Sequence, residues 1–263
     1  MSIQLVDSHC HLDRLDLEKL GFDLDHVYAQ AKELGVNHML CVAINMELWP
    51  GMMALVEKSE SVFASVGLHP CEVEGHDPSV DELIKLAEHP KVVAIGETGL
   101  DYFHFKEDTE WQRDRFRRHI AAAKVTGKPL IVHSRDAQPD TLNILEEEGA
   151  ASVGGVMHCF VDDWETARRA IELNFYISFS GIVTFKTATD LKEIAQKMPL
   201  EWMLVETDSP YLTPMPYRGK TNQPGYTRYV AEHIAELRGE SLEKVAQATT
   251  DNFFRLFKCA STK

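Results

Sequence analysis

Short apolar runs rich in β-branched residues alternate with longer amphipathic segments along almost the whole chain. A short apolar run is typical of a buried strand, and a segment with a 3.6-residue period is typical of a helix packed on one side. We expect strands at 4–8, 36–44, 62–66, 92–95, 129–132, 155–157, 175–179 and 203–205. We expect helices at 25–34, 47–59, 79–88, 110–126, 141–148, 164–173 and 189–197, and closing helices at 229–237 and 242–257.

Eight strands that alternate with helices within 263 residues favour a closed (β/α)8 TIM barrel of the α/β class over an open doubly wound sheet. The chain has no glycine fingerprint of a dinucleotide site, no repeat and no flexible linker, so we predict a single domain over 1–263. Segment 210–226 holds four prolines and two glycines. It is predicted to be a long loop after the eighth strand, where active-site loops of barrels lie.

Composition and charge narrow the classes of partner. A formal net charge of −14 disfavours loose binding to long nucleic acid, so a phosphate-bearing substrate would need local cations or bound metal. The first residues lack the pattern of a secretory signal and no run is long enough to span a membrane, so we expect a cytoplasmic protein without a membrane partner. No obligate protein partner is evident. The five cysteines form no CxxC pair and are expected to be reduced thiols.

Side chains that can bind metal ions repeatedly occur immediately after the predicted strands. In a barrel these positions converge on the carboxyl-terminal face, where such enzymes do their chemistry. They are His9 and His11 after the first strand, His69 after the third, Glu97 after the fourth, His133 after the fifth, His158 after the sixth and Asp208 after the eighth.

Any one of these residues alone is more often a core histidine, a helix cap or a loop acid; their joint placement favours a metal site. His9 and His11 are two apart in an extended segment and project to the same side. Six ligands are too many for one catalytic cation that keeps an open position, so we expect two divalent cations, with Glu97 as the bridge. Such cations lower the pKa of a bound water and neutralise charge on the substrate. Asp208 can both bind a cation and take the proton.

The identity of the cations stays open among Mg²⁺, Mn²⁺, Zn²⁺ and similar ions. Imidazole with carboxylate suits Zn²⁺, Mn²⁺, Ni²⁺ or Fe²⁺ better than an all-oxygen Mg²⁺ or Ca²⁺ cage. Two roles are open for His69: a contact to substrate or water, or a packing role. For the remaining histidines we expect structural or surface roles; they are His26, His38, His76, His89, His104, His119 and His233.

Cations near the same rim provide candidate phosphate contacts. Arg135 follows His133 by two residues, and the late loop offers Arg218 and Lys220 among Tyr211, Tyr217 and Tyr226. Barrels often bind phosphate with their last loops, and interleaved aromatics and cations stack bases and hold a backbone. The alternative is that Arg218 and Lys220 only solvate a proline-rich loop.

Eight sequence blocks, in order along nearly the whole chain, resemble the TatD family of metal-dependent hydrolases in the amidohydrolase-like superfamily. The blocks are VDSHCHLD at 6–13, GLHP at 67–70, IGETGLDY at 95–102, IVHSRDA at 131–137, HCF at 158–160, SGIVTFK at 180–186, ETDSPYLTP at 206–214 and YRGKTNQP at 217–224. The resemblance implies a TIM barrel and a divalent-metal-dependent deoxyribonuclease or phosphoesterase. It also implies 3′ to 5′ exonuclease action on DNA, with RNA as a further candidate substrate. The implied metal ligands are His9, His11, Glu97, His133, His158 and Asp208.

Two other functions stay open on the residues alone. The same metal site would serve a hydrolase of a cyclic amide, a lactone or an aminoacyl ester. A barrel that binds a partner without turnover is the second alternative, and the complete set of ligands speaks against it.

Overall fold

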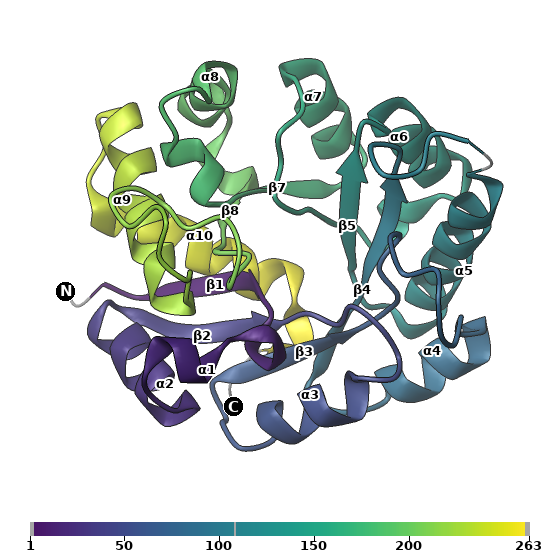
Figure 1. Cartoon of the computed structure of the whole chain (residues 1–263). Helices are drawn as coiled ribbons and strands as arrows, with labels where there is room; N and C mark the ends of the chain where they lie inside the picture. Colours follow the sequence, from purple (N-terminus) through teal and green to yellow (C-terminus); the bar gives the residue numbers. More distant parts are fainter. Residues whose placement is uncertain (1–2, 108, 261–263) are drawn as a thin grey trace. The chain divides into compact units, whose positions relative to one another are not determined.

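The computed structural model describes residues 3–107 and 109–260, and its strands alternate with helices as predicted (Figure 1). Four strands, β3, β6, β7 and β8, have the predicted bounds. The strands of the described residues are β1 (Leu5–Cys10), β2 (Val36–Cys41), β3 (Val62–Val66), β4 (Val92–Asp101), β5 (Leu130–Arg135), β6 (Gly155–Met157), β7 (Phe175–Phe179) and β8 (Met203–Val205).

The helices follow the amphipathic segments. The predicted bounds of α5 and α8 are confirmed, and α5 ends where Gly127 adopts a left-handed φ of +67°. The short α1 was not predicted, because four residues are too few to show a helical period. The helices are α1 (Leu17–Leu20), α2 (Leu24–Glu33), α3 (Trp49–Val56), α4 (Val80–Ala87), α5 (Glu110–Thr126), α6 (Gln138–Glu147), α7 (Trp164–Glu172), α8 (Thr189–Lys197), α9 (Thr227–Arg238) and α10 (Leu242–Leu256).

The strands form one eight-stranded sheet in the order of the chain, from β1 to β8. The first strand also meets the last, because Cys10 at the end of β1 forms a parallel bridge with Ser209 just after β8. A parallel sheet with helical crossovers whose first and last strands meet is a barrel. The predicted (β/α)8 TIM barrel is confirmed.

The chain separates into two compact units that interleave in sequence. The first comprises Met1–Cys41, Cys159–Asp163 and Ser178–Arg255, and the second comprises Val42–His158, Trp164–Ile177 and Leu256–Lys263. The prediction of a single domain over 1–263 stays a prediction.

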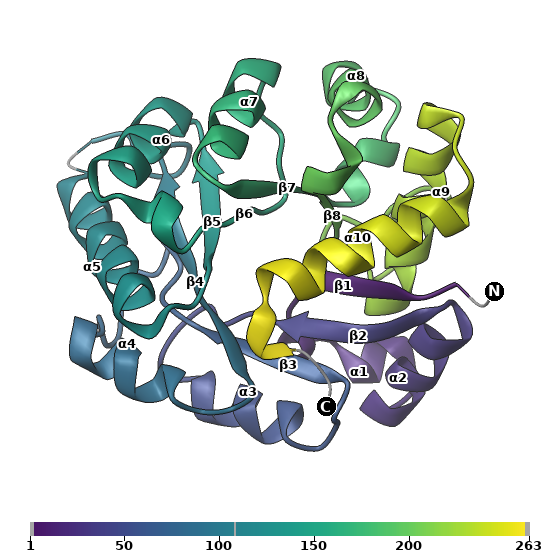
Figure 2. The ribbon, with the colours of Figure 1, turned by 180° about the vertical axis from the view of Figure 1, so that it is seen from behind.

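In the first unit, α10 lies against the amino-terminal ends of β1 and β8 (Figure 2). The Thr250 hydroxyl donates to the carbonyl of Gln4, and the Asn252 amide donates to the carbonyl of Met203 at 2.8 Å. Polar backbone groups at the amino ends of these strands are therefore paired by one helix. The carboxyl ends of the same strands are left to carry the candidate ligands.

In the second unit, β4 is longer than predicted and runs on through Asp101. Beyond an irregularity after Ile95, the register with β5 continues to the pair Asp101 and Arg135. Glycine makes this approach possible, because Gly99 has a φ of +135° and a Cβ there would lie 2.0 Å from the His133 carbonyl oxygen. The polar, glycine-rich sequence after Ile95 is thus a fully buried strand and not a loop.

The structure bears on three further predictions. The described side chains include four free cysteines, Cys10, Cys41, Cys71 and Cys159, as predicted, and the side chain of Cys259 lies outside the described part. Among the described residues, no helix combines the length and apolar character that crossing a membrane requires. The cytoplasmic location stays a prediction. Segment 210–226 is the predicted loop, ending in a 3-10 turn (Pro224–Tyr226).

We expect Gly99→Ala to destabilise the protein strongly, because the new methyl group meets backbone that cannot move away. Gly127→Ala is the matched control: it also needs a positive φ but has nothing within 4 Å of its Cβ position. The control loses about 1 kcal/mol of unfolding free energy, and Gly99→Ala loses at least about 2 kcal/mol more. Denaturant unfolding of both variants measures the difference, and equal losses would show that the close approach of β4 and β5 costs nothing.

Candidate metal centre

The first group of candidate ligands lies where β1 and β8 end. The Nε2 atoms of His9 and His11 are 3.3 Å apart, and they lie 3.8 Å and 3.3 Å from Oδ1 of Asp208. His9 and His11 are buried, and the Asp208 side chain is 15% exposed. Three predicted ligands are therefore brought to one point with their donor atoms facing one another.

Backbone hydrogen bonds between the end of β1 and the turn after β8 fix this group. The Asp208 N–H donates to the carbonyl of His9 at 2.9 Å, and the His11 N–H donates to the carbonyl of Ser209 at 2.8 Å. Asp208 has a φ of +55°, a left-handed conformation that aspartate tolerates better than most residues. The turn after β8 thereby holds the Asp208 carboxylate beside both imidazoles.

Asp7, on β1, connects this strand to Thr207, which lies just after β8. Its carboxylate accepts hydrogen bonds from the Thr207 N–H at 2.9 Å and from the Thr207 hydroxyl at 2.5 Å. Burial raises the pKa of Asp7 to about 8, although these hydrogen bonds oppose the shift. Asp7 acts on the site by positioning the segments that carry His9 and Asp208.

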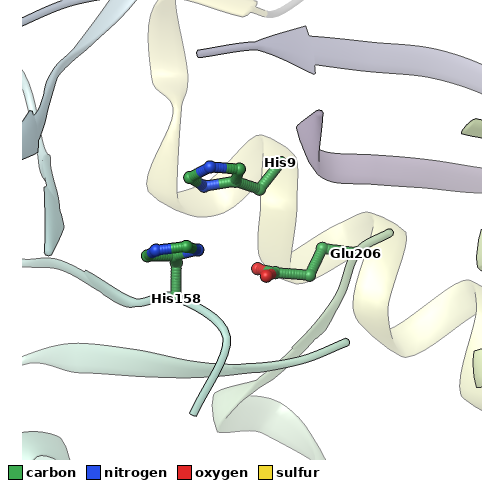
Figure 3. A group of neighbouring side chains, drawn as sticks. All are labelled: His9, His158 and Glu206. Atoms are coloured by element: carbon green, nitrogen blue, oxygen red, sulfur yellow. The ribbon is translucent and has the colours of Figure 1, made fainter. Parts of the chain in front are cut away.

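Glu206 is a buried carboxylate to which the sequence assigned no role. Its Oε1 accepts the N–H of Cys159 at 3.0 Å, and a carboxylate oxygen lies within 4.8 Å of a ring nitrogen of His9. Figure 3 shows the side chain of His9, on β1, and that of Glu206, just after β8, extending in the same direction. Figure 3 also labels His158, which follows β6 in the second unit. The signal for Glu206 was its place in the strand-end run, two residues before Asp208.

The second group of candidate ligands surrounds one oxygen of Glu97. Oε1 lies 3.2 Å from Nε2 of His69, 3.2 Å from Nδ1 of His133 and 2.8 Å from Nε2 of His158. Glu97 is nearly fully buried, at 2% exposure. Three of the predicted positions, on β4, β5 and the end of β6, are brought together here with His69 as a fourth.

The hydrogen bonds of His69 define its protonation. Its Nδ1 accepts the N–H of Cys71 at 3.0 Å, so in the neutral ring the proton sits on Nε2 and is donated to Glu97. Burial lowers the pKa of His69 despite the neighbouring carboxylate, which keeps the ring neutral. His69 is thus a hydrogen-bond donor at this site, and the sequence-predicted substrate contact stays a prediction.

Asp101 is the residue of this group that sequence reasoning missed. Its Oδ2 lies 3.1 Å from Nε2 of His133, while Nδ1 of the same ring faces Glu97. Burial opposes charge on both partners, but their hydrogen bond raises the pKa of His133, and His133 and His104 hold the pKa of Asp101 well below its usual range. A carboxylate on the far nitrogen of a ligand histidine is the usual orienting device of metal sites. Only the strand register, which places Asp101 two residues past Gly99 against β5, reveals it.

The donor atoms of both groups fit divalent cations. Ligand atoms about 2.0–2.1 Å from a shared cation at a near-tetrahedral angle lie about 3.3 Å apart, which matches the 3.3 Å separations at His11. At most one proton fits between the facing Nε2 atoms of His9 and His11, whereas one cation can accept both lone pairs. His9, His11 and Asp208 suit one ion, and Glu97, His133 and His158 suit another.

The candidate phosphate contacts stack on aromatic rings. The guanidinium of Arg135 lies 4.1 Å from the ring centre of Phe103, and that of Arg218 lies 3.9 Å from the ring centre of Phe185. Lys220 Nζ lies 5.4 Å from the ring of Tyr217. Such cation–aromatic pairs hold the charges in place without neutralising them.

Comparison with known proteins supports a family assignment. The family model described as TatD related DNase matches residues 6–258. The metal-dependent hydrolase YcfH of Escherichia coli is 50% identical over 254 residues, covering 96% of this chain and 95% of the relative. The metal-dependent hydrolase YabD of Bacillus subtilis is 43% identical over 257 residues, covering 97% and 99%.

A solved structure agrees with the fold. The crystal structure of YjjV, a TatD homologue from Escherichia coli, superposes with a TM-score of 0.90 at 30% sequence identity. The match covers 98% of this chain and 99% of that chain. The likeness therefore extends over the whole barrel.

His119 of α5 holds the segment that carries His69. Its buried ring makes the free energy of unfolding depend on pH. The buried ring accepts the Leu68 N–H on Nε2 at 3.0 Å, and burial lowers the pKa of His119 to about 4. Between pH 6.5 and 4 the unfolded chain binds a proton that the folded chain does not, so stability falls as pH falls through this window.

We expect His119→Gln, which keeps an acceptor, to remove up to about 1.4 kcal/mol per pH unit of that dependence. Urea unfolding of wild type and variant across the window measures it, and the difference between the two slopes isolates this residue from other titrating groups. Identical slopes would mean that His119 is not held neutral in the fold.

Proposed function

We propose that this chain, which belongs to the TatD family of metal-dependent hydrolases, hydrolyses phosphodiester bonds of nucleic acid as a 3′ to 5′ deoxyribonuclease. The observation that carries the proposal is the pair of histidine–carboxylate groups at strand ends, at His9, His11 and Asp208 and around Glu97. Stacked cations in the loops that follow the strands give the phosphate chain its contacts.

The proposed ligands are the six predicted from the sequence. His9, His11 and Asp208 hold one cation, and Glu97, His133 and His158 hold a second. When bound, two divalent cations supply an activated water and neutralise the negative charge that develops on the phosphate. Asp101 positions the His133 ring, and the His69 Nε2–H fixes the Glu97 carboxylate.

The Asp208 carboxylate is the proposed proton acceptor. Of the His9, His11 and Asp208 group it is the side chain that water reaches most easily, because both imidazoles are buried. It therefore takes the proton of the attacking water and holds it within the turn after β8. Glu97, which is buried among three imidazoles, serves as a ligand of the second cation.

Substrate contacts are assigned to the stacked cations. Arg135, Arg218 and Lys220 bind phosphate oxygens, and the exposed Phe103 and Tyr211 offer faces on which bases can stack. A net charge of −14 does not prevent this binding, because the local cations act within a few ångströms of the phosphate backbone of the substrate.

The test is turnover of a 5′-labelled single-stranded oligonucleotide by metal-stripped full-length protein reloaded with Mg²⁺, Mn²⁺, Zn²⁺ or Co²⁺. We expect shortening from the 3′ end only with metal. Asp208→Asn lowers kcat at least about 100-fold, while the control Glu236→Gln, at an exposed position of α9, leaves it unchanged. Protein that leaves every oligonucleotide intact with all four metals yet turns over a carboxylic ester or cyclic amide would overturn the phosphodiester assignment.

Arg135 gives a second prediction that separates substrate binding from metal binding. Arg135→Ala removes one phosphate contact, so KM rises roughly tenfold and the slope of log affinity against log salt falls by about 1. Metal content stays at the wild-type level. The control Arg168→Ala removes an arginine that pairs with Glu165 on α7 and leaves both quantities unchanged. An unchanged salt slope in Arg135→Ala, measured by titration at several salt concentrations, would remove Arg135 from the phosphate contacts.

A further inference from the structure

A second kind of metal-binding group lies beside the Glu97 cluster and takes no part in the proposed hydrolysis except through Asp101. It consists of Cys71 in the loop after β3, Asp101 at the end of β4 and His104 in the turn that follows. The Cys71 Sγ is 3.3 Å from Asp101 Oδ2 and 3.8 Å from His104 Nδ1. His104 Nδ1 is 3.0 Å from the same carboxylate oxygen.

These separations are those of three ligands on one tetrahedral cation. With sulfur about 2.3 Å and nitrogen or oxygen about 2.0–2.2 Å from a zinc ion, the edges of the tetrahedron are about 3.3–3.6 Å long. The three observed distances bracket that range. A thiol, an imidazole and a carboxylate are also the donor types that a borderline-soft cation selects, and the group contrasts with the sulfur-free ligand sets of His9 and Glu97.

We propose that Cys71, Asp101 and His104 form an accessory site for a divalent transition-metal ion such as Zn²⁺. Asp101 is buried, and Cys71 is partly covered, so two ligands are held by the fold. The His104 side chain is 50% exposed, which gives the ion an entry path and leaves the fourth position to water.

The surroundings of the thiol favour a positive charge. Burial, and after it the negative charges of Asp101, Glu97 and Glu72, raise the pKa of Cys71 to about 12. A cation at this point meets that negative potential and takes the place of the thiol proton. Asp101 also serves His133, so the accessory site shares one carboxylate with the catalytic group.

Cobalt spectroscopy of the full-length protein tests the site without any measurement of turnover. Metal-stripped protein is titrated with Co²⁺, whose thiolate complexes have a sulfur-to-metal charge-transfer band in the near ultraviolet. The six ligands of the proposed hydrolytic site contain no sulfur, so the band reports the Cys71 group even if the proposed function fails.

We expect the band in wild type together with one cobalt equivalent that Cys71→Ser lacks. The serine hydroxyl can still donate to Asp101, so the fold is preserved. His104→Ala keeps the thiol but binds that equivalent at least about tenfold more weakly. The control Cys159→Ser, which changes a partly buried thiol near Ser180, keeps both the band and the equivalent.

Three results would overturn the proposal: wild type without the band, Cys71→Ser that retains it, or Cys159→Ser that loses it. The last would assign the thiolate to Cys159 instead. Circular dichroism of each variant confirms that the spectra compare folded proteins.

Discussion

Three imidazoles, those of His69, His133 and His158, face one buried oxygen of Glu97, and much of the second unit is arranged to make this possible. A carboxylate without water is costly unless its charge is met by donors or a cation. The imidazoles that contact Glu97 come from several neighbouring segments, so the ends of β4, β5 and β6 must stay in register. The continuation of β4 past Gly99 into a close approach to β5 is the structural consequence.

In the first unit, the candidate ligands are held together by a different set of contacts. There the first and last strands of the barrel meet, and backbone hydrogen bonds at His9 and Ser209 set the distance between His9, His11 and Asp208. Hydrogen bonds between the buried residues Asp7 and Thr207 also hold these two segments together. In each unit the candidate ligands are held by pairing between strand ends, whereas the cations proposed to bind substrate stack on aromatic rings.

The sequence predicts which residues come together because barrel topology maps chain position onto spatial position. A polar residue after an apolar run reaches the rim whichever strand it follows, so His133 and Asp208 needed no tertiary information. Asp101 did, because its contact with His133 depends on register, and the glycine-rich run after Ile95 resembles a loop locally. The same limit applies to His104, whose partners Cys71 and Asp101 lie in another loop and another strand, with no shared local pattern.

The proposed activity depends on the histidine–carboxylate groups binding metal. Anomalous diffraction at the absorption edge of the bound metal, from crystals of the metal-loaded full-length protein, tests this binding most directly. We expect one peak within bonding distance of His9, His11 and Asp208 and one within bonding distance of Glu97, His133 and His158. Loaded protein that shows no anomalous density at either group would contradict it.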